Sequence, residues 1–247
     1  MNAGQKQLEI EHGRRIAEKA EKIWKRDRLV GRKRLENRLA DIKSFSAGLE
    51  GASALEIGCG TGLWTRELLS LKCRLTAVDI SPDLLKRAKE NAGGGVEFIE
   101  GDAENLPFPD GSFDFACGLS ILHHLELPRA LVEVFRALKP GGKIWFSEPN
   151  MMNPHVALQK NVPFLKRLSG DTPSETAFFK RPLHKAVAAA GFEDVEVKPF
   201  DFLYPWLPDF LVAPADIVGK RLERIPLLKE ISGSLIIHAK KPIAKKY

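Results

Sequence analysis

From Gly51 onward, the chain alternates short apolar runs with stretches of helical periodicity. The runs SALEIG and RLTAVDI are typical of strands, whereas LWTRELLSL and PDLLKRAKENA place apolar residues at three- and four-residue steps, as helices do. Strands that alternate with helices are joined by right-handed crossovers, and they assemble into a parallel sheet with helices on its faces. This alternation predicts an α/β fold with a mostly parallel sheet.

The alternation continues toward the carboxyl end of the chain. VEFIEGD, FDFACGLSI and KIWFSEP are expected to form the third to fifth strands, FEDVEVKPF the sixth, and SLIIHAKK the last, at or near the sheet edge. Helices are expected at 128–138 and near 182–190, the second ending at Gly191. The sequence KPGG at 139–142 should form a turn before the fifth strand.

The domain organisation follows from length and composition. The 247 residues, 44% hydrophobic and 28% charged, suffice for one hydrophobic core of ordinary globular type. Residues 1–48 are expected to form an N-terminal helical extension or lid of two amphipathic helices, with a break at Gly31. Residues 49–247 are expected to form the main domain, with insertions at about 150–177 and 201–232.

The net charge of +6 is concentrated in one segment. Between Arg14 and Arg38 there are eleven Lys or Arg residues and four Asp or Glu residues, which gives a local charge of +7. Such a run is typical of a solvated helix face. It also fits attraction to an anionic substrate, a membrane surface or RNA.

Location and redox state are expected to be those of a cytoplasmic protein. The sequence has no apolar signal-peptide core near its start and no run of about 18 apolar residues that could span a bilayer, although peripheral membrane contact remains open. Cys59, Cys73 and Cys117 lack the spacing of a zinc site or a disulfide framework, so they are interpreted as reduced structural thiols. The sequence does not determine the oligomeric state.

The sharpest local signal is LEIGCGTG at residues 55–62, where a strand ends in a glycine turn that leads into a helix. Glycines at this point let the backbone approach a ligand closely, beside a helix N-terminus. The glycines fall at 58, 60 and 62, and Leu63 occupies the third glycine position of the dinucleotide fingerprint GxGxxG. The turn therefore indicates a nucleotide-like pocket but fits NAD poorly.

Two acidic residues follow at the ends of the next strands. Asp79 closes the second strand, where a carboxylate can accept hydrogen bonds from both hydroxyls of a ribose. Asp102 ends the third strand, where its carboxylate can meet an adenine amino group while the Ala103 amide meets the ring. Acids at successive strand ends favour an adenosyl ligand.

These segments resemble the class I S-adenosylmethionine (SAM)-dependent methyltransferases, and among them the small-molecule group that includes the ubiquinone and menaquinone biosynthesis C-methyltransferases. LEIGCGTG, AVDIS, GDAENLPFPDGSFD, CGLSILHHL and LKPGGKIWFSEPN occur in the order and spacing of that family, over roughly residues 52–150. The resemblance implies a Rossmann-like sheet of seven strands with the last antiparallel. It also implies SAM as cofactor, S-adenosylhomocysteine as product and no metal. The segment between the sixth and seventh strands is longer than the usual short hairpin.

The resemblance also implies which residues hold the cofactor. The glycine turn would surround its methionine part, Asp79 and Ile80 its ribose and one adenine face, and Asp102 with Ala103 its adenine edge. The Gly118 carbonyl would accept from the methionine amino group, with Leu119 beside the reactive methyl. The full set of expected cofactor residues is Glu56, Gly58, Cys59, Gly60, Thr61, Gly62, Asp79, Ile80, Asp102, Ala103, Gly118 and Leu119.

Methyl transfer from a sulfonium requires the nucleophile, the methyl carbon and the sulfur to be held in line. A hydroxyl or activated carbon nucleophile also benefits from a general base, and histidine has a suitable pKa. His123 and His124 follow the fourth strand and are the first candidates, as a base or as structural and positioning residues. Glu148 and His155 are weaker alternatives.

Substrate recognition is expected from the N-terminal helices and the two insertions. Phe200, Phe202, Tyr204, Trp206 and Phe210 fit core packing, or else the wall of an apolar substrate site or shallow contact with lipid. Together with the basic N-terminal segment, they suggest an amphiphilic acceptor such as a quinone, a lipid or a lipid-linked glycan. Prolines at 205, 208 and 214 should break any helix there.

Other function classes stay open. The sequence pI of about 9.2 keeps an RNA (tRNA) methyltransferase as the main alternative. Amino-directed DNA enzymes of this fold typically carry a Pro-Pro-aromatic tetrapeptide after the fourth strand, where this chain has Gly118, Leu119 and Ser120. A non-catalytic SAM-binding partner subunit and an aminopropyl transferase are further alternatives.

Overall fold

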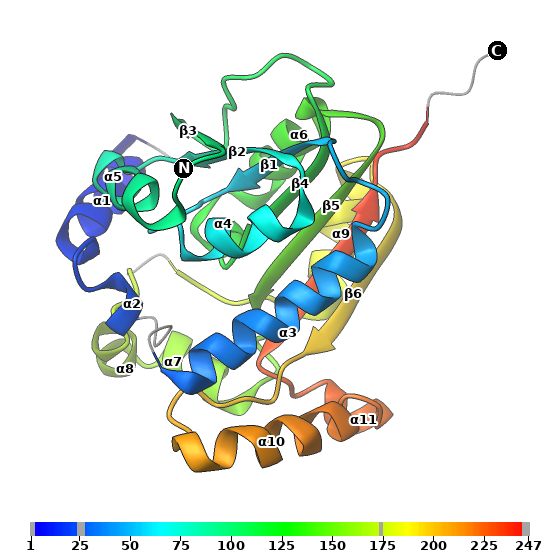
Figure 1. The fold of residues 1–247 in the computed structure, drawn as a ribbon. Helices are drawn as coiled ribbons and strands as arrows, with labels where there is room; N and C mark the ends of the chain where they lie inside the picture. The colour runs from blue at the N-terminus through cyan, green and yellow to red at the C-terminus, as the bar shows by residue number, and fades with distance from the viewer. Residues whose placement is uncertain (1–2, 24–27, 173–174, 244–247) are drawn as a thin grey trace.

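The computed structural model describes residues 3–23, 28–172 and 175–243. These residues form a sheet of seven strands in the order β3-β2-β1-β4-β5-β7-β6, with helices on both faces (Figure 1). The strands are β1 Ser53–Ile57, β2 Arg74–Asp79, β3 Val96–Glu100, β4 Phe113–Leu119, β5 Leu138–Pro149, β6 Glu193–Phe200 and β7 Ser234–Lys240. Neighbours are parallel except that β7 is antiparallel to β5 and β6. The predicted Rossmann-like α/β fold is confirmed.

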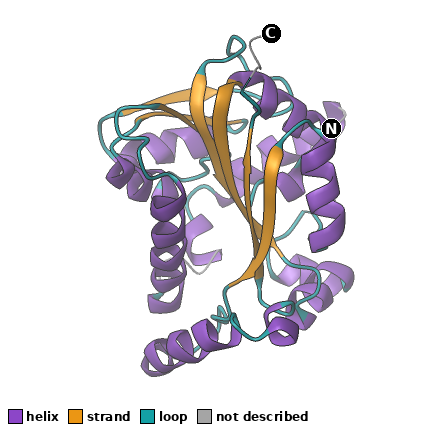
Figure 2. Cartoon of the chain, turned by 90° about the vertical axis from the view of Figure 1, so that its right-hand side faces the viewer, coloured by secondary structure: helices purple, strands orange, loops and turns teal. Residues whose placement is uncertain are grey.

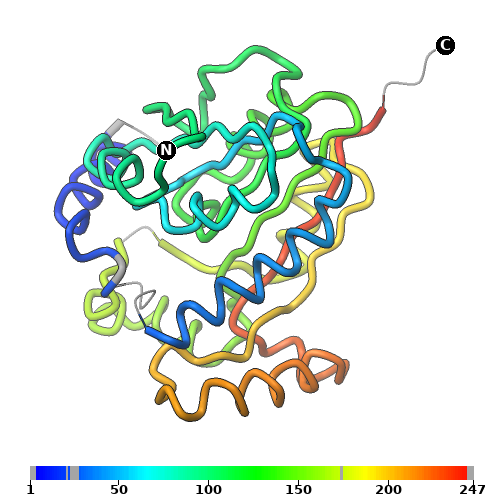
Figure 3. Tube along the Cα trace, in the orientation of Figure 1, coloured from blue at the N-terminus to red at the C-terminus, as the bar shows by residue number. Residues whose placement is uncertain are grey.

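The helices connect the strands and extend the chain at three places, as the cartoon and the trace show (Figures 2 and 3). Crossover helices carry the chain between parallel strands, and short helices fill the two insertions. Their bounds are α1 Ala3–Ile16, α2 Ala20–Ile23, α3 Leu29–Phe45, α4 Leu63–Leu68, α5 Pro82–Ala92, α6 Leu127–Ala137, α7 Pro154–Asn161, α8 Pro163–Leu168, α9 Lys180–Ala189, α10 Asp209–Leu222 and α11 Pro226–Lys229, with 3₁₀ helices η1 Leu69–Leu71 and η2 Leu122–His124.

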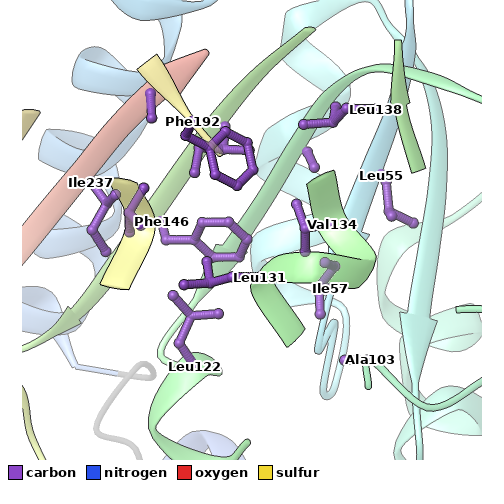
Figure 4. Packing of buried hydrophobic residues seen from close by; sticks show 14 of the residues in the cluster. Leu55, Ile57, Ala103, Leu122, Leu131, Val134, Leu138, Phe146, Phe192 and Ile237 are labelled. Atoms are coloured by element: carbon purple, nitrogen blue, oxygen red, sulfur yellow. The ribbon is translucent and has the colours of Figure 1, made fainter. Parts of the chain in front are cut away.

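Two apolar cores lie on opposite faces of the sheet. On one face, α6 and α9 pack Leu131, Val134 and Leu183 against strand residues such as Phe146 (Figure 4). On the other face, the side chains of α3 and α4 pack against β4, β5 and β7. Because both faces are covered, the central strands are apolar along most of their length.

Strand β7 contributes side chains to both apolar cores. Its expected place at or near the edge is confirmed, but its residues from Ser234 to Ala239 are all buried, although an alternating pattern was expected. Ile236 packs into the core beneath α3 and α4, whereas Ile237 packs beneath α6 and α9, since successive side chains point to opposite faces. β7 lies second from the edge, between β5 and β6.

The expected helix break at Gly31 is wrong. Gly31 lies buried in the first turns of α3, and the chain leaves its helical path earlier, between α1 and α2. A glycine costs a helix about 1 kcal/mol relative to alanine. Burial of the neighbouring Val30 against Leu203 and Val212 outweighs that cost. Residues 24–27, which belong to the same predicted extension, are outside the described residues.

The KPGG segment at 139–142 is part of β5 and not a turn before it. Phe113 pairs with Leu138, but Phe115 pairs with Lys143, so the extra residues bulge out of the ladder. Gly141 takes a φ of 80° in this bulge. The strand continues because the Gly141 amide donates to the carbonyl of Lys241, and the Lys241 amide donates to the carbonyl of Gly142.

Both insertions are helical. The first contains α7 and α8, except for residues 173–174, which are not described. In the second, Pro208 precedes α10 as expected, but Pro214 lies inside α10, so the predicted break there is wrong. The proline removes one backbone hydrogen bond, while Val212, Asp216 and Gly219 hold the buried side of the helix in place. Among the described residues, no helix combines the length and apolarity needed to cross a bilayer.

Candidate active site

A pocket of about 860 Å³ opens at the carboxyl ends of β1, β2 and β4. The glycine turn, the ends of β2 and β3 and the η2 turn form one side of the pocket. Residues of α1, α3, α7, α8 and the segment 201–206 form the other. The N-terminal extension and both insertions therefore reach the same pocket as the predicted cofactor residues.

Most of the predicted site residues line this pocket, and four do not. Thr61, Gly62, Gly118 and the weaker candidate Glu148 are set back from the wall. A Cβ on Gly118 would come within 2.9 Å of the Ile57 carbonyl and collide with Ile121 and Phe146, so packing requires glycine there. The predicted residues that line the pocket are Glu56, Gly58, Cys59, Gly60, Asp79, Ile80, Asp102, Ala103, Leu119, His123, His124 and His155.

The predicted glycine turn adopts a left-handed backbone. Gly58, Gly60 and Gly62 have φ values of 69°, 55° and 78°. A Cβ on Gly58 would lie 2.5 Å from the Ile121 side chain, and one on Gly62 would lie 2.7 Å from the Ala88 backbone. The turn is therefore pressed between η2 and α5, and substitution at either position would displace it.

Asp79 is buried at the end of β2 and faces the pocket. Its Oδ2 accepts from the Gly60 amide at 2.8 Å, and its Oδ1 accepts from the Ser81 amide at 2.9 Å. Burial raises its pKa, although these backbone hydrogen bonds act in the opposite direction. Each carboxylate oxygen has a second lone pair, so Asp79 retains acceptor capacity for ligand hydroxyls.

Asp102 is engaged by the N-terminal helix. Its Oδ1 accepts from the Glu104 amide at 2.9 Å, and its Oδ2 forms an ion pair with the Lys6 ammonium group. Lys6 lies on α1, which packs against α5. The ammonium group thus uses the carboxylate oxygen that the sequence assigned to an adenine amino group, and α1 lies across that end of the pocket.

His123 is clamped by carboxylates. Its Nδ1 lies 2.7 Å from Glu148 Oε2, while Glu148 Oε1 accepts from the amides of Ile121 and Leu122. Its Nε2 lies 3.7 Å from Glu175 Oε2. Burial lowers the pKa of His123, but the interactions with Glu148 and Glu175 outweigh burial and raise it to about 9. His123 is therefore a buried cation at neutral pH.

The raised pKa predicts a pH-dependent stability. A histidine whose pKa rises from 6.5 to about 9 on folding contributes stability that is complete below pH 6.5 and lost as pH rises through 9. The loss is about 3 kcal/mol between pH 6 and pH 10, at roughly 1.4 kcal/mol per unit. Urea unfolding at both pH values should show this fall in the wild type and a smaller fall in His123→Gln. An equal decrease in the free energy of unfolding in both proteins would contradict the stabilising interaction of His123 with Glu148 and Glu175.

His124 lies in a more open position than His123. Its Nδ1 is 3.2 Å from Glu9 Oε2, without the alignment of a hydrogen bond, and 3.9 Å from Glu175 Oε1. Lys160 Nζ lies 2.9 Å from Glu175 Oε2. Burial raises the pKa of Glu175, but His123, His124 and Lys160 outweigh it and lower that pKa. Acids from α1 and from the first insertion thus face the histidine pair.

The same residues include a candidate cation site. One ligand atom each of His123, His124 and Glu175 lies within 4.8 Å of the others. The Lys160 ammonium already neutralises Glu175, and Lys160 is itself almost fully buried between Asp171 and Glu175. A metal ion would have to replace this ammonium group.

Part of the basic N-terminal segment is bound inside the protein. Arg34 Nε donates to Asp201 Oδ2, and Arg38 Nη1 lies 3.0 Å from the same oxygen. Burial lowers the pKa of Arg38 to about 10, although Asp201 acts in the opposite direction. Lys33 lies 3.8 Å from Asp216 of α10. The cations of α3 therefore hold the second insertion, while Lys25 and Arg26 are outside the described residues.

The aromatic residues of the second insertion divide into two groups. Phe200 and Phe202 are partly buried, whereas Tyr204, Trp206 and Phe210 are exposed. Tyr204 Oη lies 3.0 Å from His155 Nδ1, so this pair joins the two insertions at the pocket. Phe200 and Phe202 therefore fit the predicted packing role, whereas Tyr204, Trp206 and Phe210 are too exposed to be core residues.

Sequence reasoning missed the acidic partners of the histidines. Glu9 lies in a helix expected to be an extension, and Glu175 and Lys160 lie in a segment expected to be an irregular loop or lid. A lone acid in such segments has no distinguishing neighbours in the sequence. Glu148, in contrast, was found because it lies at the carboxyl end of the fifth strand.

Comparison with known proteins agrees with the resemblance to methyltransferases that the sequence motifs indicated. The model of the family described as "Methyltransferase domain" matches residues 55–146. A ubiquinone biosynthesis O-methyltransferase of Xanthomonas oryzae pv. oryzae is 31% identical over 176 residues, which cover 67% of this chain and 72% of the relative. A demethylmenaquinone methyltransferase of Staphylococcus epidermidis is 29% identical over 175 residues, with coverage of 61% and 72%.

A solved structure agrees over nearly the whole chain. It is a SAM-dependent methyltransferase of Thermotoga maritima, described as a possible histamine N-methyltransferase. The match covers 92% of this chain and 97% of that one, with a TM-score of 0.66 and 24% identity. At this identity, the likeness shows a shared fold and carries no statement about substrate.

Proposed function

Because this chain belongs to the class I SAM-dependent methyltransferases, we propose that it methylates an oxygen or carbon atom of a small amphiphilic acceptor, such as a quinone, a lipid or a lipid-linked glycan. The observation that carries this proposal is that one pocket contains both the Asp79 carboxylate and the His123–His124 pair. The relatives are named for ubiquinone biosynthesis and for demethylmenaquinone, so a quinone is the first acceptor to test.

The pocket residues fit the cofactor. Asp79 has free lone pairs for the two ribose hydroxyls and is buried, which strengthens such hydrogen bonds. Trp64 lines the pocket, and its buried indole N–H has no acceptor among the described residues. Such an orphaned donor fits an anionic or carbonyl group of a ligand. We assign the ribose to Asp79, the methionine part to the glycine turn, and the adenine to Asp102 once Lys6 releases it.

When bound, SAM supplies an activated methyl group, so the chain has to align the acceptor and take up its proton. His123 is unsuited to accept a proton, because it is already protonated at neutral pH. We assign the role of base to His124, which faces the pocket from the end of η2. With SAM bound, the methyl carbon would pass from sulfur to the acceptor atom and S-adenosylhomocysteine would leave; His124 would take the proton that the acceptor loses, and Glu9 would stabilise the resulting imidazolium.

The clamped His123 serves a positioning role in this scheme. Glu148 ties its ring to the backbone of Ile121 and Leu122, so the η2 turn holds its shape beside the pocket. Its positive charge also orients Glu175 toward the histidine pair. A rigid η2 turn is what keeps the adjacent His124 in a fixed place.

The RNA alternative loses part of its support. It depended on a basic helical segment that is free to bind phosphates. Arg34, Arg38 and Lys33 of that segment are engaged by Asp201 and Asp216. An amphiphilic small molecule fits better, since the pocket combines the buried charges around His123 with apolar and aromatic walls from the insertions.

A labelling experiment tests the proposed acceptor class. Purified protein is incubated with methyl-labelled SAM and with lipid, RNA, protein and small-molecule fractions of a cell lysate. Label is expected in the lipid extract, and mass spectrometry of the product should show the addition of one methyl group. Label confined to RNA would overturn the proposed acceptor, and a larger added group would indicate transfer of another part of SAM.

A further inference from the structure

Exposed apolar side chains gather on four segments at one end of the molecule. The segments are α8, the loop 204–206, α10 and α11; in Figure 1, α10 and α11 lie along the lower edge of the view and α8 lies above them at the left. The most exposed side chains are those of Leu227, Phe210 and Leu168, at 85%, 79% and 73%. The others on these segments are Phe164, Tyr204, Trp206, Leu211, Ile217, Val218 and Leu228.

Helix α10 exposes more large apolar side chains than an ordinary surface helix does, although Val212 is buried in a small apolar cluster. It turns Val212, Asp216 and Gly219 inward, toward α3, and leaves Phe210 and Ile217 in solvent. A helix of a soluble domain normally buries its apolar stripe and exposes its polar face. Exposed apolar residues that occur singly need no explanation, but a contiguous group marks an interaction site.

The apolar group reaches the mouth of the pocket. Leu168 of α8 and Tyr204 and Trp206 of the second insertion are exposed, yet they also line the pocket. They come from different insertions and meet at the same rim. An acceptor that enters the pocket therefore passes over apolar and aromatic side chains.

Cations flank these apolar residues. Arg167 of α8 and Lys22 of α2 line the pocket, and Arg221 and Arg224 lie at the carboxyl end of α10 and just after it. No ion pair with another described residue involves these four. Of the acids on the same segments, Asp216 pairs with Lys220 and Glu230 with Lys180, whereas Asp209 at the start of α10 is exposed, so four cations stand against one such acid. The charge that this face offers to a partner is positive.

We propose that α8, residues 204–206, α10 and α11 form a docking face for a membrane surface that contains anionic lipids. Phe210, Leu168 and Trp206 enter the boundary between headgroups and acyl chains, and the flanking arginines contact the headgroups. The pocket mouth then opens onto the bilayer. The purpose of docking rests on the proposed function, because an amphiphilic acceptor resides in the bilayer. The docking itself does not depend on which acceptor is methylated.

Vesicle flotation tests the docking face. The full-length protein is mixed with vesicles of phosphatidylcholine alone or with 30 to 40% phosphatidylglycerol. The wild type is expected to float with the anionic vesicles at low salt and at least tenfold less with the neutral ones. The triple variant Phe210→Ser, Leu168→Ser, Leu227→Ser should float at least tenfold less than the wild type. All three side chains are exposed, so the fold should tolerate these changes.

A matched control replaces apolar residues elsewhere on the surface. Val132 of α6 and Ile243 are 55% and 74% exposed but lie outside the docking face. The variant Val132→Ser, Ile243→Ser should float like the wild type. The proposal is overturned if wild type and triple variant float equally, or if the wild type fails to float. It is also overturned if gel filtration shows a wild-type dimer that the triple variant loses, with no vesicle binding.

Tryptophan fluorescence gives a second, site-specific readout. Trp64 and Trp145 are buried, Trp206 is 57% exposed, and Trp24 lies outside the described residues, so the measurement is made in a Trp24→Phe background. Brominated lipids should quench this protein, and adding Trp206→Phe should remove most of that quenching. Quenching that persists unchanged in the variant would place the contact elsewhere.

SAM affinity measured by calorimetry in the triple variant separates this proposal from the proposed function. It should match the wild type, because none of the three residues touches the predicted cofactor side of the pocket. A failure of docking with intact SAM binding would overturn the docking face alone.

Discussion

Asp79→Ala is expected to weaken SAM binding at least 100-fold. A hydrogen bond to a charged group contributes about 1.5–3 kcal/mol, and the buried carboxylate is positioned to accept two from the ribose. Two such bonds correspond to about 3–6 kcal/mol, and every 1.4 kcal/mol is a factor of ten. Isothermal titration calorimetry with SAM and with S-adenosylhomocysteine measures the change directly.

Two further variants separate a binding effect from a folding effect. Asp79 also accepts from the amides of Gly60 and Ser81, so its loss loosens the glycine turn as well. Asp79→Asn keeps one acceptor oxygen and should lose less affinity than alanine. Asp83→Asn, four residues along the chain on α5, is the matched control and should bind SAM normally. Wild-type affinity in a folded Asp79→Ala protein would remove the basis of the cofactor assignment.

His124→Asn is expected to lower kcat by about 10²- to 10⁴-fold while the affinity for SAM stays within a few-fold of the wild type. This is the range by which a positioned general base accelerates a reaction. His124 lies beside the end of β4 and does not belong to the ribose-binding side of the pocket. Single-turnover methyl transfer with a saturating acceptor measures the chemical step, and calorimetry measures SAM binding.

Chemical rescue distinguishes a base from a positioning group. If His124 takes the proton, added imidazole should restore part of the kcat that is lost in His124→Ala, which a purely positioning role would not allow. His184→Asn, an exposed histidine of α9, is the control and should behave like the wild type. An unchanged kcat in His124→Asn would show that alignment of the acceptor alone suffices.

The strand and helix pattern could be predicted from the sequence because each element depends on its own residues. The alternation of apolar runs and helical stretches predicted the strands, and glycines at 58, 60 and 62 predicted a turn, which the structure shows to be left-handed. The errors came where distant residues decided the outcome. Gly31 and Pro214 stay inside helices because of packing between α3 and the second insertion, which neighbouring sequence does not reveal.

Some residues of the candidate site could likewise be predicted from the sequence, and others could not. Asp79, Asp102 and the histidine pair were identifiable, since strand ends mark the rim of a parallel sheet. The partners Glu9, Glu175 and Lys160 come from segments far away in the chain. Only their convergence shows that His123 is a clamped cation and that His124 is the more accessible of the two.

The sequence by itself determined the α/β fold, the glycine turn and the acids at the strand ends, because periodicity and turn chemistry act over a few residues. The tertiary structure alone decided what the charged and apolar segments do. It bound the cations of α3 to Asp201 and Asp216, placed Lys6 on Asp102, and left the apolar side of α10 in solvent. A charge or an apolar side chain acquires its role from what faces it, and in this protein those partners lie many residues away along the chain.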